Sequence, residues 1–101
     1  MSSVDRIRDL AEIRAKMTYP LAWSTAKWHI TEDGECIRVN TSVPLFDGLF
    51  AVESVFFPAD TIVPDDGTAR DNAIKKAIWY EVDKSIERLS AFINEGGYNV
   101  R

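Results

Sequence analysis

The segment from Thr68 to Gly96 constrains the fold of this chain most, because its apolar residues repeat as they do in one long amphipathic helix. Seven large apolar side chains recur at three- and four-residue spacings and, at 100° per residue, occupy a sector about 120° wide. They are Ile74, Ile78, Val82, Ile86, Leu89, Phe92 and Ile93. Thr68 and Asp71 form a capping-box-like pair that predicts the helix start, and Gly96-Gly97 predicts its end. Since a helix of this length is stabilised mainly by packing of its apolar face, the preceding chain must supply a hydrophobic platform.

The composition indicates a single globular domain that spans residues 1–101. Hydrophobic residues make up 46% of the chain and charged residues 28%, which suits one core and leaves no room for a second. The net charge of -4 weighs against nonspecific binding of polyanions, and one cysteine excludes an internal disulfide. The N-terminal segment is charged rather than signal-like, and no apolar run approaches the ~20 residues of a membrane span. We therefore expect a cytoplasmic protein without membrane association or a cofactor.

The N-terminal segment predicts a first helix that Ser2 or Ser3 caps and that runs to about Lys16. Its apolar stripe consists of Val4, Ile7, Leu10, Ala11 and Met17. Asp5 in the first turn and Lys16 in the last match the helix dipole. Pro20 ends the helix, because the residue before a proline is pushed out of the helical conformation.

From Leu21 the apolar period changes to two, and two Asp-Gly pairs predict hairpin turns. A type I′ turn needs positive φ at both central residues, which Asp33-Gly34 and Asp47-Gly48 favour. Together these turns predict a three-stranded antiparallel meander.

The two turns also predict the register of that meander, whose strands lie roughly at 23–31, 35–45 and 49–57. The predicted facing pairs are Ile30–Ile37, Trp28–Val39, Phe46–Leu49, Val43–Val52 and Val39–Phe56. The inner face then consists of Trp28, Ile30, Ile37, Val39, Val43, Phe50, Val52 and Phe56. A one-residue slip would mix apolar and polar side chains, so the sorting favours this register.

The predicted fold class is therefore α+β, a two-layer α-β-β-β-α sandwich with both helices on one face of the sheet. The connection 58–67 includes Thr61-Ile62-Val63, which either adds a short edge strand or packs as a loop. The inner face of the meander is the platform that the long helix requires.

Few residues are placed for catalysis, and we expect no enzyme activity. The single His29 and the single Cys36 lie diagonally across the first hairpin, but no third residue orients the imidazole. The aspartates before the long helix lack the spacing of a calcium loop and are better explained as helix caps. We accordingly expect no catalytic residue and no metal site.

The outer face of the predicted sheet aligns aromatic and cationic side chains, a composition typical of interfaces. The candidate partner-binding residues are Trp23, Lys27, His29, Arg38 and Phe57, joined by Tyr80 from the polar side of the long helix. Arg38 beside Phe57 predicts a cross-strand cation–π contact. Alternatively, the loop 58–67 or the C-terminal tail folds over Phe57 and Val55.

The leading hypothesis is a small non-enzymatic module that binds a protein through this face. An inhibitor or adaptor of a larger complex, including a nucleoprotein complex, fits the size of the chain, as do accessory proteins of phages and mobile elements. Self-association as a homodimer through the same face is a variant of this hypothesis.

The alternative hypothesis is nucleic-acid binding. The α-β-β-β-α order, with Lys75-Lys76 near the start of the last helix, resembles the layout of double-stranded-RNA-binding domains over about residues 4–93. The resemblance implies that bases at this helix start grip phosphates, although Asp65, Asp66 and Asp71 surround it here and would repel them. Aromatic side chains on an open sheet could instead stack bases.

Overall fold

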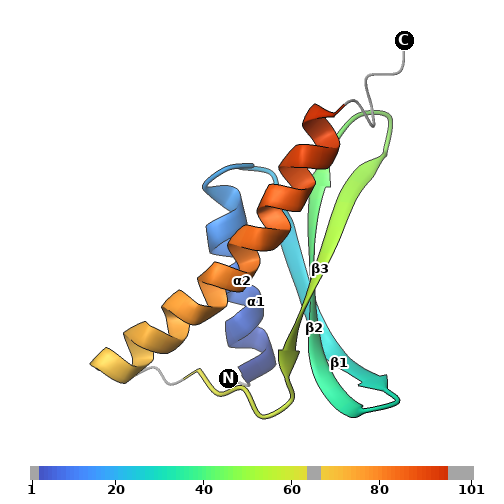
Figure 1. The fold of residues 1–101 in the computed structure, drawn as a ribbon. Helices are drawn as coiled ribbons and strands as arrows, with labels where there is room; N and C mark the ends of the chain where they lie inside the picture. Colours follow the sequence, from blue (N-terminus) through green and yellow to red (C-terminus); the bar gives the residue numbers. More distant parts are fainter. Residues whose placement is uncertain (1–2, 64–66, 96–101) are drawn as a thin grey trace.

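The computed structural model describes residues 3–63 and 67–95 and has the element order that the sequence predicts (Figure 1). The elements are α1 Ser3–Lys16, β1 Trp23–Thr31, β2 Gly34–Pro44, β3 Phe50–Pro58 and α2 Ala69–Asn94. The strands form one antiparallel sheet in the order β1-β2-β3, and both helices pack against it. The predicted α+β fold class is confirmed.

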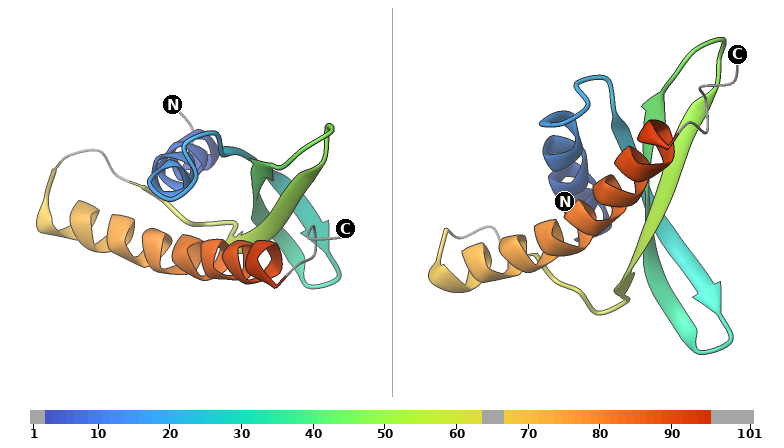
Figure 2. Two further views of the ribbon diagram at one scale, coloured as in Figure 1. Left: turned by 90° about the horizontal axis from the view of Figure 1, so that it is seen from above. Right: turned by 45° about the horizontal axis from the view of Figure 1, so that its top comes forward.

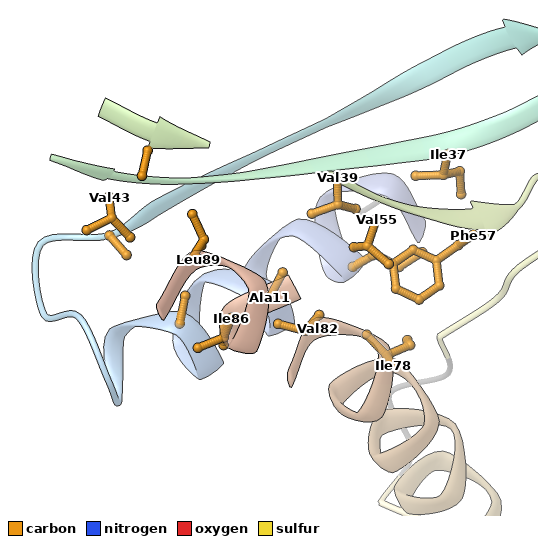
Figure 3. Close-up of a cluster of buried hydrophobic side chains, with 14 of the residues drawn as sticks. Ala11, Ile37, Val39, Val43, Val55, Phe57, Ile78, Val82, Ile86 and Leu89 are labelled. Carbon is orange, nitrogen blue, oxygen red and sulfur yellow. The ribbon is translucent and has the colours of Figure 1, made fainter. Parts of the chain in front are cut away.

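Both helices cover one face of the sheet and leave the other face uncovered (Figure 2). Helix α1 packs on β1 and β2, and α2 packs on β3 and on α1. The buried core between the two layers consists of Ile7, Ala11, Ala15, Ala22, Ile37, Val39, Val43, Ala51, Val55, Phe57, Val63, Ile78, Val82, Ile86 and Leu89 (Figure 3). The apolar stripe of α2 thus meets the platform that its sequence requires.

Helix α2 begins where the capping pattern predicts. The side-chain oxygen of Thr68 accepts a hydrogen bond from the N–H of Asp71, 3.2 Å away, which satisfies one of the donors that a helix start leaves unpaired. Asp71 is buried, and its Oδ2 lies 3.3 Å from Nζ of Lys75. The helix ends at Asn94, and the predicted stop signal Gly96-Gly97 lies outside the described residues.

Polar side chains join α1 directly to α2. Arg14 donates from Nε and Nη2 to the two carboxylate oxygens of Asp83, at 2.8 and 3.0 Å. The hydrogen bond to Asp83, and secondly its charge, raise the pKa of Arg14 above its ordinary value. The same guanidinium lies 5.5 Å from the ring centre of Trp79, whose Nε1 donates to the Leu10 carbonyl. Trp79 therefore belongs to the helix–helix contact.

The register of β1 and β2 differs from the prediction by two residues. Thr31 is opposite Gly34, so Glu32 and Asp33 occupy the turn. Oγ1 of Thr31 accepts from the N–H of Asp33 and donates to the Gly34 carbonyl, which moves the turn one position earlier than predicted. Because the register shift is even, each side chain of β1 stays on its predicted face.

The second turn forms as predicted, but the strands beyond it are displaced by one residue. Asp47 and Gly48 have φ values of 51° and 77°, and the N–H of Leu49 donates to the Phe46 carbonyl. The N–H of Leu45 donates to the Leu49 carbonyl, so two residues on the β2 side face one residue on the β3 side. This is the arrangement of a β-bulge, and the ladder beyond it is shifted by one.

The displacement turns every side chain of β3 to the face opposite its predicted one. The helix side of β3 consists of Ala51, Glu53, Val55 and Phe57, and the other side of Phe50, Val52, Ser54 and Phe56. The prediction that Phe50, Val52 and Phe56 belong to the inner face is therefore wrong. Glu53 is accommodated on the helix side because Nε of Arg88 in α2 pairs with its Oε1 at 2.7 Å.

Trp28 and Ile30 lie on the predicted side of β1 but are not core residues. They belong to the end of the first hairpin that extends past the helices, and their exposed fractions are 54% and 75%. Val39 is fully buried, as predicted, but its strand neighbours are Ala26 and Val55 rather than two aromatic residues.

The connection after β3 packs as a loop. Thr61-Ile62-Val63 form no strand, and Val63 is buried in the core. Over the described residues, neither helix has the length and apolarity to cross a membrane.

Candidate functional site

The candidate site is the uncovered side of the sheet, which we call the open face. Its residues form rows of cross-strand neighbours: Pro44–Phe50, Trp23–Ser42–Val52, Thr25–Asn40–Ser54, Lys27–Arg38–Phe56 and His29–Cys36–Pro58. Both helices lie on the opposite side of the sheet (Figure 2). Within residues 3–63 and 67–95, no helix or strand covers the open face.

One end of the open face is apolar. The rings of Trp23 and Phe50 meet edge to face, with their centroids 5.1 Å apart. Phe50 and Val52 have exposed fractions of 52% and 51%. Contiguous apolar surface of this kind is characteristic of sites that bind another molecule.

The other end combines cations with an aromatic ring. Lys27 and Arg38 are neighbours across β1 and β2, and Phe56, which is half exposed, lies beside Arg38 on β3. The ring of His29 lies 5.7 Å from that of Phe56. None of the residues in the rows above is Asp or Glu, although the whole chain has a net charge of -4. The open face is therefore positive relative to the rest of the protein.

Arg38 is held by its neighbours in a fixed orientation. Its Nε donates to Oδ1 of Asn40 at 3.2 Å and to Oγ of Ser54 at 3.4 Å, and Ser54 also donates to Asn40. No described residue accepts a hydrogen bond from the terminal amino groups of Arg38. These amino groups form a fork that matches a carboxylate or a phosphate, and little side-chain entropy is lost when it binds.

Of the five residues predicted for the outer face of the sheet, four lie together on the open face and one does not. Trp23, Lys27, His29 and Arg38 are in the rows above, whereas Phe57 is 6% exposed in the core. The predicted contact between Arg38 and Phe57 across the open face is wrong. The alternative assumed that Phe57 and Val55 lie on this face under the loop 58–67 or the tail, whereas both lie in the core, where Phe57 and Thr61 of the loop line one groove; the tail lies outside the described residues. The cause is the shift of β3, which places Phe56 beside Arg38 instead.

Sequence reasoning missed the residues that β3 contributes to the open face. Phe50, Val52 and Phe56 alternate in the sequence, but so do Ala51, Val55 and Phe57. Because both alternating sets are apolar, the pattern of β3 alone does not say which set faces outward.

Tyr80 lies on the helical layer and is not part of the open face. It is 62% exposed, with Nζ of Lys84 4.3 Å from the ring centre. Together with Ile74 and Phe57, it lines an open apolar groove of about 380 Å³. Tyr80 and the open face are therefore two separate candidate surfaces.

His29 and Cys36 face each other directly across β1 and β2 rather than diagonally, as a result of the two-residue shift. Among the described residues, no group of three or more His, Cys, Asp and Glu side chains is placed to hold a metal ion. The ring of His29 lies beside that of Phe56, so the imidazole belongs to the end of the open face that combines cations with an aromatic ring.

Side chains from the helices cover part of each free edge of the sheet. Oε1 of Glu12 accepts from the N–H of Ser24 at the β1 edge, at 2.9 Å. At the β3 edge, Nη2 of Arg88 donates to the Ser54 carbonyl at 3.1 Å. A strand from another molecule cannot use these backbone groups without displacing the helix side chains, so the centre of the sheet is more accessible by its face than by its edges.

A scan of protein-family models gave no match to this chain, and searches of curated proteins and of solved structures gave none either.

Proposed function

We propose that this chain is a small non-enzymatic module that binds another protein through its open face, as an inhibitor or adaptor of a larger complex does. The observation that supports it most is the half-exposed apolar end beside a fixed arginine, on a face without a carboxylate. Burial of exposed aromatic side chains supplies affinity, and charge complementarity supplies specificity.

The same geometry indicates the chemistry of the partner's surface. The apolar row of Trp23 and Val52 lies four strand positions from the row of Lys27 and Phe56, which is about 13 Å at 3.3 Å per residue. A matching surface presents apolar side chains at one end and a carboxylate about 13 Å away, within reach of the Arg38 fork.

Single-stranded nucleic acid is the second candidate, because exposed aromatic rings beside cations also fit stacked bases and phosphates. The start of α2 is less suited to this role, since Lys75 already pairs with the buried Asp71. The net charge of -4 also opposes the approach of a polyanion. These two features favour the protein partner.

The test uses a photo-reactive amino acid placed at Phe56 and, as a control, at Tyr80 of the folded chain in extract from its host. We expect a covalent adduct with one protein from position 56 and none with that protein from position 80. Arg38→Ala and Trp23→Ala should each weaken the binding of the purified partner roughly thirtyfold or more, with the fold retained.

Treatment with nuclease and a salt titration separate the two candidates. An adduct that nuclease removes, or an affinity that falls steeply with salt for single-stranded DNA, would assign the open face to nucleic acid. Equal adducts from positions 56 and 80, or unchanged affinity in both alanine variants, would remove the open face as the binding site.

A further inference from the structure

The outer edge of β1 is covered over only part of its length. Residues of an antiparallel ladder alternate in the direction of their backbone groups, so the N–H groups of Ala26, Trp28 and Ile30 point the same way as that of Ser24. Glu12 accepts from Ser24, whereas no described residue accepts from the other three at this edge. Among the described residues, the edge from residue 26 to residue 30 is therefore a row of donors and acceptors without partners.

Two large apolar side chains project from this same stretch. Trp28 and Ile30 lie on the helix side of the sheet, where the hairpin runs away from the helices (Figure 2), and their exposed fractions are 54% and 75%. The unpaired backbone groups and the exposed apolar side chains therefore lie on the same five-residue stretch, 26–30. Natural proteins usually protect such an edge, so its exposure calls for an occupant.

We propose that the occupant is a second copy of this chain, paired antiparallel with β1 about a two-fold axis at Trp28. Ala26 then lies opposite Ile30 of the second copy, and the two Trp28 residues lie opposite each other. The two three-stranded sheets become one six-stranded sheet, with the symmetry that is commonest for homodimers.

The pattern of β1 is self-complementary in this register. Its helix side brings only Ala26, Trp28 and Ile30 of each copy together, so apolar side chains meet apolar side chains. On the other side, Lys27 lies opposite His29, so the two lysines are not directly paired. The two Ser24 ends, which α1 covers through Glu12, lie at opposite ends of the paired segment, so the α1 helices do not compete for space.

The size of the interface predicts a weak dimer. Five paired residues and two half-exposed Trp side chains, each with about half of the usual 150–250 Å² still to bury, place it below the usual 1,200–2,000 Å² of stable complexes. The dimer is therefore expected at high micromolar concentration rather than at nanomolar concentration.

This proposal is independent of the open face and adds to its role. The two-fold axis is perpendicular to the joined sheet, so both open faces point to the same side. A partner with two copies of its docking surface would bind such a dimer more tightly than it binds a monomer.

Sedimentation velocity of the purified chain, from micromolar to millimolar protein, tests the proposal. We expect a shift toward twice the monomer mass with increasing concentration, and its loss in Trp28→Lys and in Ile30→Lys. Ile62→Lys introduces the same charge at an exposed isoleucine away from this edge and should leave the shift unchanged. Circular dichroism of each variant verifies that the fold is retained.

Hydrogen exchange identifies the paired segment. The amide protons of Ala26, Trp28 and Ile30 should become at least tenfold better protected at high concentration, whereas that of Ser24 should not change, because Glu12 already pairs with it. A monomer at every concentration overturns the proposal, and so does a dimer without protection at these amides. If these amides become protected only when a different protein is added, the edge binds that protein, and the proposal of a second copy is also overturned.

Discussion

Phe56 and Phe57 are adjacent in β3 and have the same side chain, but they lie in opposite environments. Phe57 packs under α2 in the core, whereas Phe56 is half exposed on the open face beside Arg38. The same contrast holds for the whole sheet, whose helix side is buried by two helices and whose open side keeps aromatic residues in solvent. Apolar character in a strand therefore does not identify its core side, and an apolar side that remains open is a candidate for binding.

The largest expected effect comes from placing a charge on each side of the sheet in turn. Val39→Asp buries an unpaired carboxylate where no water reaches, and we expect it to lower the free energy of unfolding by several kcal/mol. Thr25→Asp adds the same carboxylate on the exposed open face and should change the stability by about 0.5 kcal/mol or less. Urea denaturation measures both; similar losses would contradict the assignment of the two faces.

The adjacent phenylalanines give the sharpest test of the β3 register. Phe57→Ala should cost roughly 3–5 kcal/mol, because it leaves a cavity between β3 and α2. Phe56→Ala should cost ~1 kcal/mol, since half of that ring already contacts water. Without the bulge, the two results would be exchanged, so thermal or chemical unfolding of this pair decides the register.

The next effect concerns the helix that covers the buried side. Ile78→Ala and Val82→Ala should each destabilise the protein by roughly 1–4 kcal/mol, because both side chains are in the core. Lys84→Ala removes an exposed pair with Glu81, 3.4 Å long, and an exposed contact with the Tyr80 ring, and should cost about 1 kcal/mol or less. Glu87→Ala serves as a second surface control. Comparable melting temperatures for all four variants would mean that α2 does not use its apolar stripe for packing.

The smallest effect is expected at the turns that set the two registers. Gly34 has a φ of 120°, which side chains rarely adopt, whereas Gly48 has a φ of 77°, near the left-handed region that asparagine tolerates. Gly34→Asn should therefore cost about 1 kcal/mol and Gly48→Asn a few tenths. The glycines have open space around them, so strain rather than a clash is measured. The reverse order in a denaturation experiment would show that the turn geometries are misassigned.

Several local features could be predicted from the sequence because short-range interactions determine them. The Thr68 cap, the amphipathic stripe of α2 and the positive φ values at Asp47-Gly48 depend on neighbouring residues only. The order of elements and the packing of both helices on one face follow from these local features and from the need to bury one stripe on each helix. The sequence also predicts four residues of the open face correctly, because the side chains of β1 and β2 lie on their predicted faces. These residues are Trp23, Lys27, His29 and Arg38.

The face of β3 could not be predicted, because its two alternating sets are about equally apolar. Glu53 suggests that its own set faces water, yet the structure places it on the helix side, paired with Arg88 of α2, which follows 35 positions later in the chain. Ala51 in the same set is small enough to lie under α2 near Leu89. The sequence of β3 alone predicts neither Arg88 nor Leu89 as a contact.

By itself, the sequence determined the two helices, the three strands, the second turn and the side of β1 and β2 that meets the helices, because capping, periodicity and turn propensity act over a few residues. The tertiary structure alone decided the bulge after β2, and with it the faces of Phe56 and Phe57 and the aromatic composition of the open face. The physical reason is that a one-residue shift changes no local propensity. The shift changes only which side chains of β3 are buried under α2 and which charge of β3 pairs with α2. Both contributions to the free energy of folding arise only when the helix is packed on the sheet.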